Sequence, residues 1–276
     1  MPRQKREPKP ARKCIFCGGT PISREHIWAA WMRPYLPTGD QSQYIEKTNL
    51  GVGMTDSRPG PLNVKGDARS QKQKVACISC NNGWMSELQN LTKPILLPVL
   101  LGERKSLSQR KQKILATWAT MFVMVYETTN PEYAATTDIQ RRTFKQQMVP
   151  PQNWLIWCAP FSDDGCPAIH MGFATLKNHV GPLLLGDGTI HRAQITLCGG
   201  GKVCFLIFGA ASDEAFQAFS QFVAVLAGRA GFVRIWPCGG SIIRTTDNRT
   251  SPLAWSDLRA FRDAVIACLT QAATRR

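Results

Sequence analysis

The spacing of apolar positions changes near residue 150. From Asn153 onward, apolar residues occur in short runs bounded by glycine, proline and asparagine, a pattern typical of buried strands. The runs cover residues 153–159, 169–176, 190–198 and 203–209, and the sequence Gly-Gly-Gly-Lys at 199–202 fits a hairpin loop. We therefore expect an antiparallel sheet in the second half of the chain.

Two helices and one more strand are expected after these runs. Ser212 begins a segment in which aromatic and aliphatic residues recur at helical spacing. Residues 232–236 form another apolar run, and Ser256 is the expected cap of a last helix through Leu269. With the sheet, these elements predict an α+β C-terminal domain at 150–276.

Helical spacing also marks the middle of the chain. Trp84, Leu88 and Leu91 fall on one face of a helix that begins at about residue 81. We expect Pro94 and Pro98 to interrupt the apolar run that follows. The sequence Ser-Leu-Ser-Gln at 106–109 resembles a capping box, and the helix that it opens should end before residue 130.

Two segments show little apolar periodicity. Residues 37–74 are rich in Gly, Pro, Ser, Thr, Asn and Asp, and we expect a long insertion with one hairpin around Leu62–Val64. Residues 1–13 contain three prolines and predict a basic disordered arm.

The charge of the chain narrows the class of partner. Lys and Arg number 34 against 19 Asp and Glu, which gives a formal net charge of +15. Such an excess favours a polyanionic partner, and nucleic acid is our first choice. The candidate contacts are the basic residues of the arm and one beside the first cysteine motif, namely Arg3, Lys5, Arg6, Lys9, Arg12, Lys13 and Arg24.

The length of the apolar segments and the positions of the cysteines indicate the cellular compartment of the protein. The chain has no apolar window of 18 residues and no signal-peptide pattern, so we expect a cytoplasmic protein with no membrane partner. Six of the ten cysteines lie in apolar segments, where they are expected to be reduced and buried.

The other four cysteines form two Cys-x-x-Cys pairs. Cys14 and Cys17 lie in the sequence CIFC, and Cys77 and Cys80 lie in CISC. The short spacing lets both sulfurs of a pair reach one ion, and two such pairs commonly hold one tetrahedral zinc. We therefore predict a structural Zn²⁺ bound by all four thiolates.

Polar residues with catalytic chemistry follow each pair. Glu25 and His26 come after the first pair, and Asn81 comes directly after the second, so the zinc site would bring the three together. Each also has a simpler interpretation. Asn81 or Asn82 fits the cap of the following helix, and a lone histidine is more often structural than catalytic.

The two motifs together resemble the HNH endonuclease family over about residues 14–91, and the run CNNGWMSEL resembles bacterial and phage proteins of HNH type. This resemblance implies an N-terminal ββα-metal domain, which we expect at 14–128 with its following helix. It also implies that His26 is the general base and that Glu25 and Asn81 hold a catalytic Mg²⁺ or Mn²⁺. These residue types suit phosphodiester hydrolysis, because the reaction needs a base near neutral pKa and a hard divalent cation.

One family feature is missing. The family usually has another asparagine on the strand before the second pair, where it orients the histidine, but this chain reads SQKQKVAC there. Gln71, Gln73, Asn49 and Asn63 are the candidate substitutes.

We therefore expect a metal-dependent endonuclease, with DNA as the first choice of substrate. The alternatives are a catalytically silent zinc-knuckle module that binds nucleic acid and a module that binds an acidic protein. We expect the C-terminal domain to contact the substrate, a protein partner or a second copy of the chain.

Overall fold

The computed structural model describes most of the chain. It covers residues 12–36, 45–50, 60–61, 68–129, 131, 134–163, 165–175, 191–239, 243–244 and 251–274. The expected arm is therefore described only at its last two residues, and the expected hairpin at Leu62–Val64 lies outside the described part.

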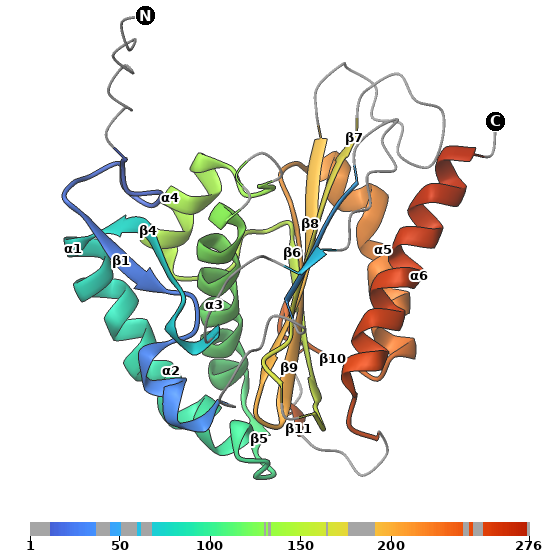
Figure 1. Cartoon of the computed structure of the whole chain (residues 1–276), viewed down its shortest axis with the longest axis horizontal. Helices are drawn as coiled ribbons and strands as arrows, with labels where there is room; N and C mark the ends of the chain where they lie inside the picture. Colours follow the sequence, from blue (N-terminus) through green and yellow to red (C-terminus); the bar gives the residue numbers. More distant parts are fainter. Residues whose placement is uncertain are drawn as a thin grey trace, which may run out of the picture.

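The first half contains a two-stranded sheet and most of the helices (Figure 1). In chain order the elements are β1 (Ile22–His26), η1 (Ala30–Tyr35), β2 (Ile45–Leu50), β3 (Gly60–Pro61), η3 (Ala68–Ser70), β4 (Lys72–Cys77), α1 (Ile78–Cys80), η4 (Asn81–Met85), α2 (Ser86–Leu100), β5 (Ser106–Leu107), α3 (Gln109–Tyr126), η5 (Glu127–Thr129) and α4 (Asp138–Gln147).

The second half supplies the long strands and two covering helices. Its elements are β6 (Trp154–Pro160), β7 (Ala168–Thr175), β8 (His191–Gly200), β9 (Val203–Ala210), α5 (Asp213–Arg229), β10 (Val233–Trp236), β11 (Ile243–Arg244) and α6 (Trp255–Thr274). The predicted strands and the helix after Ser212 are confirmed to within two residues, and the Ser212 hydroxyl accepts the N–H of Ala215 at 3.2 Å.

The large sheet has the strand order β10-β6-β9-β8-β7-β2-β3. The first five strands in this order are antiparallel neighbours, as expected for an α+β protein. β2 adds to the sheet parallel to β7, and β3 pairs with β2. The insertion at 37–74 therefore supplies strands to the sheet that the second half of the chain builds.

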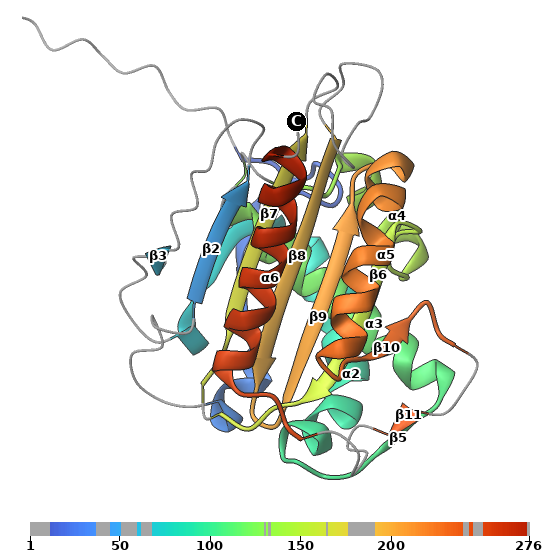
Figure 2. The same cartoon turned by 90° about the vertical axis from the view of Figure 1, so that its right-hand side faces the viewer.

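Helices cover both faces of this sheet (Figures 1 and 2). One apolar cluster joins the two Cys-x-x-Cys segments, α2 and α3 to one face, with Trp118 packed against Phe205 at 5.8 Å between ring centroids. A second cluster joins α5 and α6 to the opposite face. Residues on both sides of the expected domain boundary thus share the first cluster, while the division into domains stays a prediction.

Three element boundaries differ from the sequence predictions. α2 continues through Pro94 and Pro98. Because Pro94 has no N–H, the carbonyl of Asn90 four residues earlier has no helical partner. Asn90 and Pro94 are both exposed, so water can reach that carbonyl. α6 begins at Trp255, before Ser256. In the 106–109 segment Ser108 is the cap, because its hydroxyl accepts the N–H of Lys111.

Among the described helices, none has both the length and the apolar character needed to cross a bilayer.

Candidate metal centre and catalytic site

The four predicted cysteine ligands meet in one cluster. The sulfurs of Cys14, Cys17, Cys77 and Cys80 all lie within 4.8 Å of one another. Cys17 Sγ lies 3.6 Å from Cys77 Sγ and 3.6 Å from Cys80 Sγ. Tetrahedral zinc with Zn–S bonds of about 2.3 Å separates its sulfurs by about 3.8 Å. The cluster therefore has the ligand set and the size of a four-thiolate zinc site.

The backbone around each pair suits a metal knuckle. Gly18 has a φ of +73°, a conformation that favours glycine, and its N–H donates to the Cys14 carbonyl at 2.8 Å. The N–H of Gly19 donates to Cys17 Sγ, and the N–H of Cys80 donates to Cys77 Sγ, each at 3.4 Å. Such donors stabilise thiolates over thiols.

Burial and hydrogen bonds move the cysteine pKa values in opposite directions. The pKa of Cys17 is raised, chiefly by burial, although the N–H of Gly19 donates to its sulfur. Burial acts to raise the pKa of Cys77, but the N–H of Cys80 and the neighbouring thiols bring it down to about 7. Burial raises the pKa of Cys80 to about 12. Because zinc binds thiolates, its binding would displace protons from this cluster.

The first knuckle is fixed to the rest of the protein by a hydrogen bond and by packing. The N–H of Ile15 donates to the Val75 carbonyl of β4 at 2.9 Å. Phe16 is 1% exposed, and its ring meets Trp84 edge-on at 4.9 Å and Phe144 of α4 at 6.5 Å. The cysteine cluster therefore ties β4 and the start of the following helix to this buried aromatic group.

The candidate catalytic residues lie on a strand-strand-helix unit. β1 pairs antiparallel with β4, and the chain runs from β4 through Cys77 and Cys80 into η4, a π-helical turn that leads into α2. Glu25 and His26 are the last two residues of β1, and Asn81 is the first residue of η4. Two paired strands followed by a helix thus surround these residues, while the assignment to a ββα-metal fold stays a prediction.

Glu25 is a buried carboxyl group. It is 8% exposed, and burial raises its pKa from 4.5 to about 7. Its cross-strand partner is Gln73. At neutral pH the group is close to half ionised, so a divalent cation would compete with a proton for it.

His26 is half-buried and lies directly across from Lys72 of β4. Its pKa is lowered, first by burial and then by the positive charges of Lys72 and Arg33. The imidazole is therefore neutral at pH 7, the form in which a histidine accepts a proton.

The amide of Asn81 is held against β1. Its Nδ2 donates to Ser23 Oγ at 2.9 Å and lies 3.5 Å from the Arg24 carbonyl, and Ser23 Oγ donates to the Ala76 carbonyl at 3.0 Å. Asn81 therefore meets β1 at Ser23 and Arg24, the two residues before Glu25. Ser23 was missed by the sequence prediction, because only the folded pairing shows its bridging role.

The candidate orienting residues do not lie across from His26. Gln73 faces Glu25, Gln71 has the same parity along β4, and Lys72 takes the position opposite His26. Asn49 lies in β2, where it pairs with Gly172 of the large sheet. Asn63 falls outside the described residues.

Three of the seven candidate nucleic-acid contacts are described. Arg12, Lys13 and Arg24 are exposed, and Arg24 and His26 have the same parity along β1. Arg3, Lys5, Arg6 and Lys9 lie outside the described part of the chain.

Comparisons with known proteins add no relative. No family model matches the chain, and neither the curated proteins nor the solved structures contain a match.

Proposed function

We propose that this protein is a metal-dependent endonuclease of HNH type. DNA is the substrate that we favour, and His26 is the proposed general base. The observation that carries the proposal is the hydrogen bond from Asn81 Nδ2 to Ser23 Oγ at 2.9 Å. It holds the residue after the second cysteine pair against the strand that ends in Glu25 and His26. The three residue types that the resemblance singled out therefore come from one compact unit.

The electrostatics supports the proposed roles. His26 is neutral at pH 7 because burial, Lys72 and Arg33 lower its pKa, so it can take a proton from an attacking water. Glu25 and Asn81 offer a carboxylate and an amide oxygen, which are hard ligands of the kind that Mg²⁺ and Mn²⁺ take. A cation held there would stabilise negative charge on the phosphate and on the leaving oxygen.

The four thiolates have a separate task in this proposal. A Cys₄ site offers zinc no open coordination position, so zinc would join the first knuckle to β4 and the helix start and would take no part in the reaction.

A nucleic-acid-binding module without catalysis is the second candidate. It is favoured by the burial of Glu25 and by the hydrogen bonds of Asn81, since both are also what structural residues would show. In that case Glu25 packs and Asn81 fastens the helix to β1.

The test is cleavage of plasmid DNA and of RNA with Mg²⁺ or Mn²⁺, compared with the same protein without added divalent metal. His26→Ala should lower the rate by a factor on the order of 10² to 10⁴, the usual contribution of a positioned acid or base. Glu25→Ala and Asn81→Ala should lose apparent metal affinity, so that more Mg²⁺ or Mn²⁺ partly restores their rate.

His191→Ala, which changes a histidine of β8, is the matched control and should cleave like wild type. Zinc content, melting temperature and nucleic-acid affinity of His26→Ala should stay near wild type. If His26→Ala cleaves as fast as wild type, the base is another residue. If wild type binds nucleic acid and cleaves neither substrate with either metal, the binding module is the better conclusion.

A further inference from the structure

A groove of about 670 Å³ runs beside β4, within the range of about 300–1,000 Å³ that is common for ligand sites. Its walls come from three places: the chain at and before the first knuckle, strand β4, and the turn after α3. The residues that matter for its chemistry are Arg12, Lys13, Lys72 and Lys74 on one side and Thr128 and Thr129 in the turn.

The groove is positively charged. Arg12, Lys13, Lys72 and Lys74 line it and are exposed, and none of its lining residues is acidic. Four cations and no carboxylate in one groove suit an anionic ligand.

The sequence of β4 and the first knuckle place these charges in a row. Lys72 and Lys74 are two residues apart in a strand, which separates them by about 7 Å along β4. The hydrogen bond from Ile15 to Val75 fixes the knuckle at the next position of the strand and brings Lys13 to the same groove. A row of cations contributed by two segments fits a chain of phosphates better than a single phosphate.

The row of cations also ends beside the proposed catalytic residue. Lys72 lines the groove and is the cross-strand partner of His26. A ligand that contacts Lys74 and Lys72 in turn therefore arrives at the end of β1, where Glu25 and His26 lie.

We propose that this groove binds the phosphate backbone of nucleic acid and directs it to the end of β1. The inference deepens the proposed function and rests on it for the choice of ligand, but binding and cleavage are measured separately. The turn after α3 forms the opposite wall, and there the Thr128 hydroxyl donates to the Val125 carbonyl at 2.7 Å. The same turn contributes Thr129 and Pro131 to the groove, and none of these residues is acidic.

The test uses the full-length protein, a short double-stranded DNA and a buffer without added divalent metal, so that binding is measured without cleavage. Lys72→Gln/Lys74→Gln should weaken binding by roughly tenfold or more at physiological salt and reduce the slope of log K against log salt by about 2. Lys93→Gln/Lys111→Gln removes the same charge from exposed lysines of α2 and α3 outside the groove, and it should bind like wild type.

Two further measurements make the result independent of folding. Lys72→Arg/Lys74→Arg keeps the charge and should keep both the affinity and the salt slope. In the wild-type protein, bound DNA should protect Lys72 and Lys74 from acetylation and leave Lys93 and Lys111 reactive, as measured by mass spectrometry.

Equal affinity and slope in the groove variant and wild type overturn the proposal, and so does unchanged acetylation of Lys72 and Lys74. A mononucleotide that competes as well as the duplex overturns the assignment to a phosphate chain. If binding depends on the groove but no metal supports cleavage, the groove stands and the endonuclease proposal falls. If the groove variant cleaves at the wild-type rate, the groove proposal falls and the endonuclease proposal stands.

Discussion

Glu25 carries its proton to a higher pH than an ordinary glutamate, because burial raises its pKa from 4.5 to about 7. Between these two values the folded protein holds a proton that the unfolded chain has released. The stabilisation that this proton provides is fully present below about pH 4.5 and is lost as the pH rises through about 7. The carboxyl group therefore favours folding less at the pH at which it would hold a metal.

Glu25→Gln should remove this pH dependence, because the amide has nearly the same shape and does not ionise. In buffer without added divalent metal, the free energy of unfolding of the variant relative to wild type should rise between about pH 5 and pH 8, by at most roughly 3 kcal/mol. Urea unfolding across this range measures it. Glu87→Gln changes an exposed glutamate of α2 and should show no such trend. A constant difference between Glu25→Gln and wild type would contradict the shifted pKa.

The residues of the candidate site could be predicted from the sequence where their spacing alone determines that they meet in the structure. The Cys-x-x-Cys pairs predicted the cluster of four sulfurs, which the structure contains. The residue that would orient His26 could not be predicted, because its identity depends on strand register. The register places Lys72 across from His26. Ser23 was missed for the same reason: its contact with Asn81 joins residues 58 positions apart.

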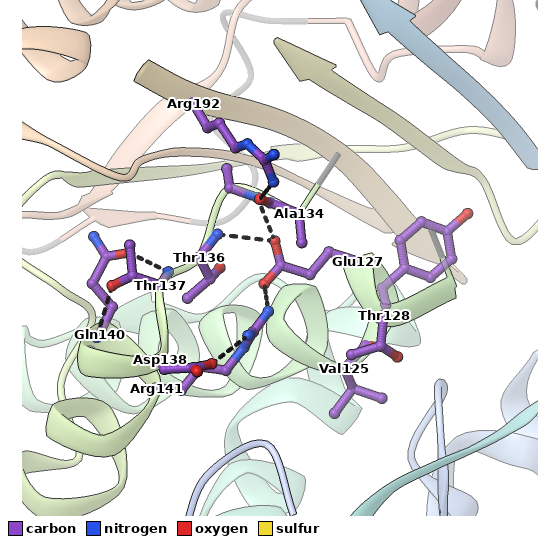
Figure 3. A network of polar contacts seen from close by, with 12 residues as sticks. Val125, Glu127, Thr128, Ala134, Thr136, Thr137, Asp138, Gln140, Arg141 and Arg192 are labelled. Atoms are coloured by element: carbon purple, nitrogen blue, oxygen red, sulfur yellow. Dashed lines mark hydrogen bonds and ion pairs between the residues drawn. The ribbon is translucent and has the colours of Figure 1, made fainter. Parts of the chain in front are cut away.

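At the scale of elements, a buried ion pair joins the end of α3 to α4 (Figure 3). Glu127 is fully buried, and its Oε1 lies 2.7 Å from Arg141 Nη2. Its Oε2 accepts the N–H groups of Ala135 and Thr136 at 3.1 and 3.2 Å. One carboxylate thus anchors η5, the chain before α4 and α4 itself.

Arg141→Met should destabilise the protein by about 3–5 kcal/mol, because it leaves the Glu127 carboxylate buried without its cation. Thermal or urea unfolding measures this change. Arg142→Met alters the neighbouring exposed arginine and should have little effect. Adding Glu127→Gln to Arg141→Met should recover part of the stability, since the amide carries no charge. An Arg141→Met protein as stable as Arg142→Met would show that the ion pair contributes nothing.

Some elements escaped prediction for identifiable reasons. α4 has a capping box in which Thr137 accepts the Gln140 N–H and Gln140 accepts the Thr137 N–H, and the Thr-x-x-Gln spacing was a usable signal. β2 had no comparable signal, because Ile45–Leu50 becomes a strand by pairing with β7, far along the chain. The long strands of the sheet were predictable, because burial on both faces gave them continuous apolar runs.

At the scale of the whole molecule, the region of the four clustered cysteines and the sheet depend on one another. The apolar cluster that contains Phe16, Cys14, Cys77 and Cys80 continues through α3 to one face of the sheet. Gln89 of α2 strengthens the same connection, because its Oε1 accepts the indole N–H groups of Trp31 and Trp118, each at 3.1 Å. Loss of the knuckle structure should therefore destabilise parts of the protein well beyond residues 14–91.

Cys77→Ser tests this dependence. The variant should lose the bound zinc and, because the knuckle would release Phe16 from its contacts with Trp84 and Phe144, melt on the order of 10 °C below wild type. Metal analysis and calorimetry of the purified proteins measure the two effects. Cys268→Ser replaces an exposed cysteine of α6 and should keep both the zinc and the melting temperature. A Cys77→Ser protein that lacks zinc and melts like wild type would show that the metal does not hold this core together.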